Sequence, residues 1–289
     1  MFQDILVTGL VNGSAYALLA IGFSLVFGVA RIVNIAHTAF YMLAAYVLYA
    51  LLIGGGVGPL ISGVVAVGSV TVFSVVCYRL VIEPVRQHES AVLIATIALA
   101  LIFQETVLRI YGGNYLGIPS VIEGGITLAG IAIPWQRLVI LLIASGMLLA
   151  TWILLYRTRL GLAVRATAND LEVANLMGMD VNRVAMLTVG ISVALAAIAG
   201  VAVAPVFVVD PFMWLAPLVT VLSVVVLGGL GSIYGSVIGS LIIGYVEAIT
   251  VFALPQGAFL KGAVALSMMV IVLLVRPEGL FGVAFEEER

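Results

Sequence analysis

The residues best suited to specific chemistry lie in the polar segment 165–183, RATANDLEVANLMGMDVNR. Asn169 stands at an expected N-cap position and Glu172 follows three residues later, which is the spacing of a capping box. Asp170 and Glu172 place negative charge in the first turn, where the helix dipole favours it. Gly178 suits the left-handed conformation that ends many helices. The pattern predicts a capped helix of about two turns between Asn169 and Gly178.

The chemistry that this short helix favours is docking. A helix of two turns is unstable alone in water, so we expect it to pack on another surface. A helix lying on the membrane surface is one alternative, but the segment is short and its polar face has no basic residues. Docking to a cytoplasmic partner explains the caps better, with the small Ala174 on the docking face. The predicted docking loop covers 157–183 and includes Arg165.

Polar residues inside apolar segments form a second group of candidates, because such residues are costly in a bilayer and are functional by default. Asn34 and His37 are three residues apart and are expected to share a helix face. They could bind a substrate or hydrogen-bond neighbouring helices. Glu247 is the only charged residue in the apolar stretch 214–253. It could meet an arginine from another helix or line a transport pathway.

Three glycines, Gly228, Gly229 and Gly231, interrupt that same stretch. An unwound segment at membrane depth would expose backbone groups to a substrate, as in many transporters. A tight cytoplasmic turn is the alternative, and the sequence favours it. The stretch 214–253 accordingly forms either two spans joined by a turn or one span preceded by a half-helix.

The sequence contains no combination of residues typical of an enzyme. There is no G-x-S-x-G motif, no histidine near a candidate nucleophile and no pair of acids in one loop. The two histidines, His37 and His88, lie in different segments without a cysteine or carboxylate cluster. We therefore expect no catalytic residue, no metal site and no cofactor. Cys77 is the lone cysteine, so an internal disulfide is excluded and the redox compartment stays open.

The composition defines the elements that must position these residues. The chain has 289 residues, of which 64% are hydrophobic and 9% charged, and its mean hydropathy is +1.30. Soluble domains carry about 25% charged residues, and only helices or closed barrels satisfy the backbone in lipid. The chain is therefore expected to be an all-α, polytopic bundle of about eight or nine spans forming one transmembrane domain over 1–289. It has no basic patch typical of nucleic-acid binding. The apolar runs fall near 5–29, 32–53, 58–82, 90–111, 136–156, 184–209, 214–229, 233–253 and 262–275.

Small residues repeat at four-residue spacing in three of the runs. This pattern is typical of helices that approach closely in lipid. Packing without any substrate role is the favoured interpretation. The three ridges are Gly9, Gly13 and Ala17; Ser192, Ala196, Gly200 and Ala204; and Gly235 with Gly239.

The distribution of basic residues predicts the orientation, because cytoplasmic loops carry an excess of lysine and arginine. With nine spans and the loop 157–183 in the cytoplasm, nine arginines lie inside and three basic residues lie outside. The N-terminus is then outside and the C-terminus cytoplasmic, whereas eight spans would break this parity. The inside set is Arg31, Arg79, Arg86, Arg157, Arg159, Arg165, Arg183, Arg276 and Arg289, and the outside set is Arg109, Arg137 and Lys261.

The segment 172–178, EVANLMG, resembles the EAA loop of ATP-binding-cassette (ABC) importer permeases, whose pattern is E-A-A-x3-G. Val173 departs from the first alanine. Over nearly its whole length the chain resembles the branched-chain amino-acid ABC permease family, in particular its LivH-type subunit. Thr38 departs from the glycine that often follows the histidine in that family. The resemblance is carried by four blocks in order: NGSAYALLAIGFSLVFGVARIVNIAH (12–37), RATANDLEVANLMG (165–178), VLGGLGSIYGSVIGSLIIGYVE (226–247) and VRPEGLFG (275–282).

The resemblance implies a division of labour among several subunits. Two permease subunits, this chain and a LivM-like partner, would form the pathway. Two cytoplasmic ATPase subunits would bind the EAA loops, and an extracytoplasmic binding protein would deliver the substrate. The chain itself lacks the phosphate-binding motif G-x-x-x-x-G-K-[ST]. The implied function is import of branched-chain or other hydrophobic amino acids, or a related small amide, across the inner membrane.

Two other function classes compete with this interpretation. A secondary transporter or channel for a small polar solute would need no ATPase, and a proton-coupled carrier would use the few titratable groups in the spans, Glu105, Glu247 and His37. A membrane enzyme is disfavoured because no reactive constellation is present. The sequence leaves open the exact solute, the choice between a homodimer and a heterodimer, and the polar residues that touch the substrate.

Overall fold

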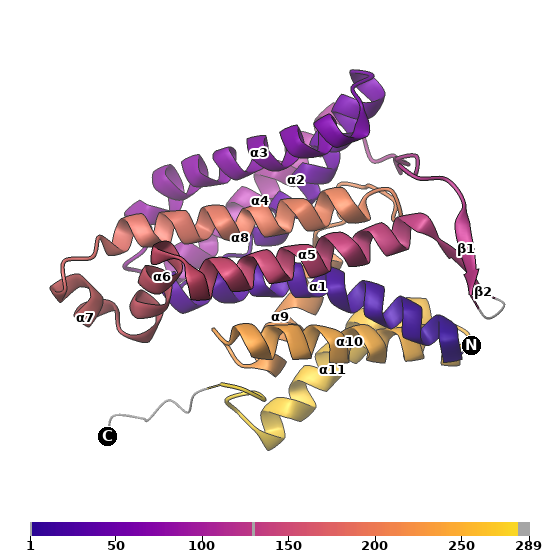
Figure 1. Ribbon diagram of the computed structural model, residues 1–289. Coiled ribbons are helices and arrows are strands. Elements are labelled where there is room, and N and C mark those ends of the chain that lie inside the picture. The colour runs from indigo at the N-terminus through magenta and orange to yellow at the C-terminus, as the bar shows by residue number, and fades with distance from the viewer. Residues whose placement is uncertain (1, 129–130, 283–289) are drawn as a thin grey trace.

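The apolar runs form helices that lie side by side in the computed structural model, which describes residues 2–128 and 131–282 (Figure 1). Within these residues eight helical segments are long and apolar enough to cross a bilayer, for which about 20 residues are needed. The prediction of an all-α, polytopic protein is confirmed. The eight segments are Phe2–Ala30, His37–Gly54, Pro59–Val85, Glu89–Tyr111, Trp135–Arg157, Val181–Val203, Ile233–Ala253 and Gly257–Val275.

Several of these segments combine more than one kind of helical turn. The second and third spans end in π-helical turns, and the third continues into a 3₁₀ turn. The helices are α1 (Phe2–Ala30), α2 (His37–Tyr49), η1 (Ala50–Gly54), α3 (Pro59–Cys77), η2 (Tyr78–Ile82), η3 (Glu83–Val85), α4 (Glu89–Tyr111), α5 (Trp135–Arg157), α6 (Arg159–Asn169), α7 (Leu171–Leu176), α8 (Val181–Val203), α9 (Leu215–Gly228), α10 (Ile233–Ala253) and α11 (Gly257–Val275).

Helix α9 is too short to span a bilayer. Its 14 residues extend for about 21 Å at the usual rise, against a hydrocarbon core of about 30 Å. The stretch 214–253 is therefore one full span, α10, preceded by a half-helix. The chain reaches α9 through an irregular segment in which Val209 pairs with Leu116 by two backbone hydrogen bonds of 2.9 Å.

Helices α1 and α10 pack antiparallel at the centre of the bundle, and small residues allow their backbones to approach. A Cβ at Gly244 would overlap the backbone of Gly9 and Gly13. A Cβ at Gly13 would in turn press on the backbone of Ser240 and Leu241. On α8, Gly200 lies directly against the carbonyl of Tyr41. The predicted packing role of the small-residue ridges is confirmed at these positions.

The second span begins inside the bundle. Helix α1 ends at Ala30, and the six residues that follow are not helical. They return along α1, because the ring of His37, the first residue of α2, contacts the carbonyl of Leu19, eleven residues before the end of α1. The predicted continuous span over 32–53 is therefore wrong at its start, since residues 31–36 are non-helical and end in a turn.

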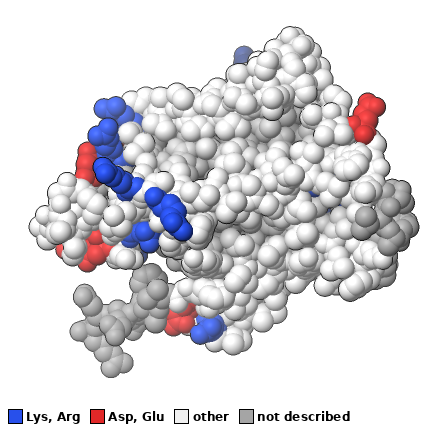
Figure 2. All heavy atoms as spheres, in the orientation of Figure 1, with Lys and Arg blue, Asp and Glu red and all other residues white. Residues whose placement is uncertain are grey.

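The two ends of the bundle differ. A two-stranded antiparallel hairpin, β1 (Gly125–Leu128) and β2 (Ile131–Pro134), lies at the end where α1 begins (Figure 1). Its register pairs Gly125 with Pro134 and Leu128 with Ile131. Helices α6 and α7 lie at the opposite end. Basic side chains gather at that end as well, on the face in view (Figure 2).

The chain enters and leaves the described bundle at opposite ends (Figure 1). Close to its last described residues, the backbone N–H of Leu280 donates to the carbonyl of Leu227 at the end of α9. The chain runs from one end of the bundle to the other in each of the eight spans, and once more in the segment that contains α9. This odd number of crossings puts the two described ends of the chain at opposite ends of the bundle. The predicted placement of one terminus outside and the other in the cytoplasm stays a prediction, and Arg289 lies outside the described residues.

Candidate functional site

Helix α7 and its caps form the exposed end of the bundle. Asp170 is the N-cap, because its carboxylate accepts hydrogen bonds of 2.9 Å from the backbone N–H groups of Glu172 and Val173. The sequence placed the cap one residue earlier, at Asn169, and that prediction is wrong. Asn169 instead ends α6, a helix that sequence reasoning did not anticipate in the loop.

The predicted role of Gly178 in ending this helix is confirmed. Gly178 has a φ of 81°, in the left-handed region that glycine adopts without steric cost. The backbone N–H of Gly178 donates to the carbonyl of Asn175 at 3.0 Å, and that of Met179 donates to Ala174 at 3.1 Å. These two bonds form a Schellman motif, which satisfies the last carbonyls of the helix.

The exposed face of α7 differs from the face that was predicted. Ala174 is only 2% exposed and packs inside the chain, so its predicted position on the docking face is wrong. A side chain without a polar group sits there because α7 rests on α6 and α8. The outward face instead carries Val173, Leu176 and Met177, which are 52%, 86% and 78% exposed. Three apolar side chains on a capped helix outside the spans form a surface suited to docking.

Helix α6 holds α7 at a fixed place on the bundle. Its N-cap is Thr158, whose hydroxyl accepts from the backbone N–H of Gly161 at 3.0 Å. Gly161 lies directly against the carbonyls at the end of α5, so the two helices are joined by a tight corner. At the other end of α6, Arg31 donates to the carbonyl of Ala168 at 3.1 Å. This bond ties α6 to the end of α1.

Arg165 lies in the predicted docking loop but points away from α7. Its guanidinium carbon lies 4.7 Å from the centre of the Tyr156 ring on α5, the geometry of a cation–π contact. The structure therefore separates Arg165 from the outward face of α7.

His37 is fully buried and both of its ring nitrogens have partners. Nε2 lies 3.0 Å from the carbonyl oxygen of Leu19, and Nδ1 lies 3.2 Å from the hydroxyl of Ser192 on α8. The imidazole thus joins α1, α2 and α8 through hydrogen bonds. This arrangement favours the packing role among the two that the sequence left open.

Asn34 does not share a helix face with His37, and that prediction is wrong. It lies in the non-helical segment before α2, where its backbone carbonyl accepts from the N–H of His37 at 3.2 Å. Its side chain is only 2% exposed, and neither the amide oxygen nor the amide nitrogen has a hydrogen-bond partner among the described residues. Buried polar groups are normally paired, so Asn34 is the stronger candidate of the two for contact with a transported solute.

These environments predict different results for the two alanine variants. His37→Ala should lower the free energy of unfolding by about 2 kcal/mol, because it opens a cavity and leaves buried groups unpaired. Asn34→Ala removes a side chain without partners and should leave the thermal stability of the detergent-solubilised protein close to that of the wild type. Thermal melting monitored by size-exclusion chromatography measures both. Equal losses in the two variants would contradict this distinction.

Glu247 is also paired inside the bundle. The hydroxyl of Tyr16 on α1 donates to its Oε2 at 2.8 Å, and the hydroxyl of Thr220 on α9 donates to its Oε1 at 3.3 Å. The side chain is buried. Among the described residues, the carboxylate is hydrogen-bonded by two hydroxyls and not by the arginine that the sequence left open. These bonds connect α1, α9 and α10.

The three candidate pathway glycines lie in the turn between α9 and α10. A Cβ at Gly228 would overlap the backbone of Gly235, and one at Gly229 would overlap Gly282. Gly229 and Gly231 have φ values of 101° and 82°, which favour glycine. The tight turn that the sequence favoured is present, and its location on the cytoplasmic side stays a prediction. The turn lies near Gly28, at the same end of the bundle as α6, away from Glu247.

A cavity of about 190 Å³ lies at the opposite end of the bundle. Polar and cationic side chains from three helices reach it, namely Asn12 of α1, Arg137 of α5 and Lys261 of α11. Arg137 also donates to the hydroxyl of Thr8 at 3.4 Å. Cations and an amide donor beside apolar walls are suited to binding a carboxylate attached to an apolar group. The sequence had singled out the two cations only for orientation.

Comparison with known proteins identifies the family. The family model described as the branched-chain amino acid transport system permease component matches residues 5–273. The chain belongs to this permease family. The high-affinity branched-chain amino acid transport system permease protein LivH of Escherichia coli (strain K12) is 31% identical, and the match covers 97% of this chain and 96% of that protein.

Other members of this permease family match over similar lengths. The high-affinity permease protein BraD of Pseudomonas aeruginosa is 31% identical, with 96% of this chain and 94% of that protein covered. The probable branched-chain amino acid transport permease protein LivH of Methanocaldococcus jannaschii is 27% identical, with 98% and 93% covered. The resemblance based on four sequence blocks is thereby confirmed. The chain is a multi-pass transport permease of the ABC importer type and not itself an enzyme.

A solved structure shares the fold of this permease. PsaBC from Streptococcus pneumoniae, solved in complex with a Fab, has a TM-score of 0.52 and 15% sequence identity, covering 95% of this chain and 92% of that chain. At this identity the comparison bears on the arrangement of helices alone.

Sequence reasoning missed the partners that explain the buried polar residues of this permease. Tyr16, Thr220 and Ser192 supply the hydroxyls around Glu247 and His37. Ser192 had been grouped with the small-residue ridge of α8, which correctly indicated a close helix contact. Hydroxyl residues are common in spans, so nothing in the sequence marked these three as partners of a given acid or histidine.

Proposed function

We propose that this chain forms half of the translocation pathway of an ABC importer for branched-chain amino acids. A second, LivM-like permease subunit forms the other half, and an extracytoplasmic binding protein delivers the substrate. Two cytoplasmic ATPase subunits drive the cycle, one of them docked on α7. The names of the matching relatives support this substrate class. The complex belongs in the inner membrane, and residues 1–289 act as a single permease domain with 157–183 as its coupling loop.

One observation carries the ATPase contact of this proposal. The outward face of α7 presents Val173, Leu176 and Met177 at the end of the bundle, with Ala174 anchored beneath. Exposed apolar side chains on a helix outside the spans are in contact with water, and docking on a partner is favourable because it buries them. Glu172 and the Schellman cap at Gly178 correspond to the fixed positions of the EAA pattern. The cap holds the short helix in a defined shape before a partner binds, which reduces the ordering cost of docking.

Site-specific cross-linking tests this contact. With Leu176→Cys and a cysteine in the cleft of the ATPase subunit, a disulfide cross-link should form in the assembled complex. Cys77 is buried, so the native background should be low. Trp135→Cys, exposed at the opposite end of the bundle, is the matched control and should give no cross-link. Cross-links of equal yield at the two positions would contradict docking at α7.

The pathway in this proposal lies along the broken start of α2. The unpaired amide of Asn34 supports contact with the solute there, since non-helical backbone at membrane depth occurs where it is buried in protein or lines a cavity. Asn34→Ala should reduce the rate of uptake several-fold while the complex still assembles. Unchanged uptake kinetics of leucine, isoleucine and valine in this variant would remove Asn34 from the pathway.

The orientation of this proposal places α7 in the cytoplasm. A cysteine at the exposed Asn169 should react with a membrane-impermeant maleimide only after the cells are opened. Tyr115→Cys, exposed in the loop at the opposite end, is the matched control and should react in intact cells. The reverse labelling pattern would overturn the predicted orientation.

A further inference from the structure

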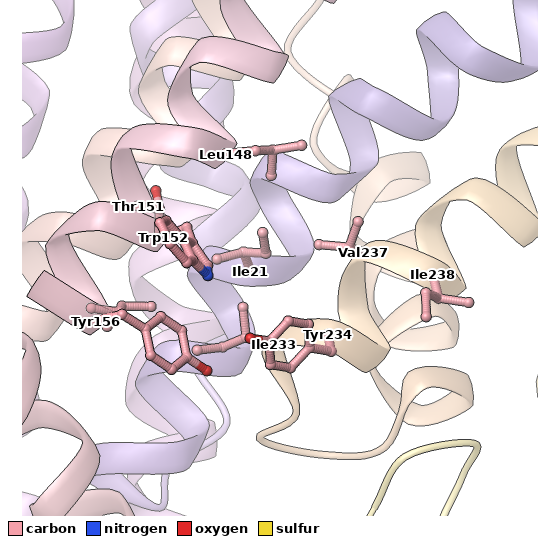
Figure 3. Close-up of a pocket in the computed structure, with 10 residues that line it drawn as sticks. Ile21, Leu148, Thr151, Trp152, Tyr156, Ile233, Tyr234, Val237 and Ile238 are labelled. Carbon is pink, nitrogen blue, oxygen red and sulfur yellow. The ribbon is translucent and has the colours of Figure 1, made fainter.

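A groove of about 250 Å³ lies on the outer surface of the bundle between α1, α5 and α10 (Figure 3). Trp152 and Tyr156 of α5 form one wall, and Tyr234 and Ile238 of α10 form the other. Ile21 of α1 is buried at its base. Trp152, Tyr234 and Ile238 are also partly exposed, so the groove opens towards whatever surrounds the bundle.

The lining of the groove favours a hydrocarbon. Leu148, Leu155, Ile233 and Val237 add further apolar surface. The one aliphatic hydroxyl, that of Thr151, donates to the carbonyl of Met147 in its own helix at 2.8 Å. The remaining polar groups of the lining are the hydroxyls of Tyr156 and Tyr234 and the indole N–H of Trp152. They are too few to replace the hydration shell of a zwitterionic solute, whose burial there would be costly. An acyl chain meets no such cost.

The positively charged side chain of Arg165 lies at the end of the groove near α6. Arg165 stacks on the ring of Tyr156, one of the lining residues. Its Nε is buried and has no hydrogen-bond partner among the described residues. A buried guanidinium N–H without a partner points to a missing acceptor, because such groups are normally paired.

The surroundings of Arg165 are basic. Arg157 and Arg159 precede it at the same end of the bundle, and residues 156–169 contain no acidic residue. The space-filling view shows basic side chains gathered at this end of the front face (Figure 2). Basic pockets between transmembrane helices at the membrane surface recognise anionic lipid headgroups.

The aromatic residues place this end of the groove at the membrane surface. Tyr156 and Tyr234 face each other with ring centres 6.3 Å apart, and the Trp152 ring lies 5.8 Å from that of Tyr156. Tyrosine and tryptophan concentrate at the level of the lipid headgroups. The groove therefore runs from the headgroup level, beside Arg165, into the hydrocarbon region along Val237 and Leu148.

We propose that this groove binds one acyl chain of an anionic phospholipid, whose phosphate is held by Arg165 beside Tyr156. The guanidinium suits a phosphate because its N–H groups match the phosphate oxygens in a fixed plane. The bound lipid contacts α5, α6 and α10, and α6 is the helix on which α7 packs. This site is independent of the transported solute.

The experiment measures lipid retained by the whole transporter complex. The complex is reconstituted into vesicles of phosphatidylglycerol and phosphatidylethanolamine in equal amounts, extracted in mild detergent and analysed by mass spectrometry. The wild type should retain phosphatidylglycerol in preference to phosphatidylethanolamine. Arg165→Gln should reduce that preference by roughly fivefold, the effect of one cation near an anionic surface.

Two further variants separate the groove from general surface charge. Val237→Phe fills the groove while every charge stays in place, and it should also lose the retained lipid. If Arg165→Gln does not fold, Val237→Phe still tests the proposal. Arg276→Gln removes a cation at the same end, on the exposed turn after α11, and should retain lipid as the wild type does.

Three results would overturn the proposal. The first is an unchanged preference in Arg165→Gln or Val237→Phe. The second is an equal loss in Arg276→Gln, which would indicate bulk electrostatic attraction. The third is a cysteine cross-link between Ile238→Cys and another protein subunit, which would show that a protein and not a lipid covers the groove.

Discussion

Replacing Leu176 by aspartate is expected to abolish ATP-driven uptake while the permease stays folded. Leu176 is 86% exposed on α7, so a charge there meets water in the isolated chain and costs little stability. In the assembled complex the same charge would be buried in an apolar contact without a partner, which costs several kcal/mol. Such a loss at one docking helix reduces ATPase binding by about a hundredfold or more. Co-purification of the ATPase subunits and uptake of radiolabelled leucine measure the two effects.

The matched control for this variant is Leu162→Asp. Leu162 on α6 is also strongly exposed, at 61%, but it lies outside α7. Its replacement should leave the bound ATPase and the uptake rate close to wild type. If Leu176→Asp transports as the wild type does, α7 is only a connector. If both variants lose the ATPase equally, the docking surface is broader than the outward face of α7.

Gly244→Val is expected to prevent α1 and α10 from packing and so to eliminate the folded permease. A Cβ at Gly244 would overlap backbone atoms of Gly9 and Gly13, and backbone cannot move aside as a flexible side chain does. Overpacking a core lowers the free energy of unfolding by about 1–3 kcal/mol. Because the valine side chain would overlap backbone and not a flexible side chain, we expect a loss at or above the upper end of that range. The yield of monodisperse protein after detergent extraction measures the result.

Gly146→Val provides the control for that substitution. Gly146 lies in the middle of α5, and a Cβ there meets nothing within 4 Å. The same change of residue should therefore leave the yield and the melting temperature close to wild type. Normal yields of Gly244→Val would contradict the close approach of α1 and α10.

The elements that follow from local physical rules could be predicted from the sequence. Apolar length determines the spans, and Gly178 marks the end of α7 because few other residues accept its backbone conformation. The small residues of α1 and α10 likewise indicated close packing. The α7 N-cap was misplaced by one residue, since Asn169 and Asp170 are both good caps and only the helix geometry chooses between them.

The remaining features depend on contacts between distant segments, which the sequence pattern does not contain. Residues 31–36 are apolar enough to continue a span, yet they turn back because His37 bonds to Leu19 and Ser192. Ala174 faces inwards because α6, unforeseen in the loop, lies beneath α7. Hydroxyls from other helices surround Glu247 for the same reason. Each is a tertiary contact across many residues of sequence.

Uptake by reconstituted vesicles tests the central claim most directly. Proteoliposomes are prepared with this chain, a LivM-like permease, the two ATPase subunits and the binding protein, and uptake of leucine, isoleucine and valine is followed with and without ATP. The account predicts uptake only when ATP and all the subunits are present, and none when this chain is omitted. Uptake by this chain alone, without ATP, would contradict it and identify an ATPase-independent transporter.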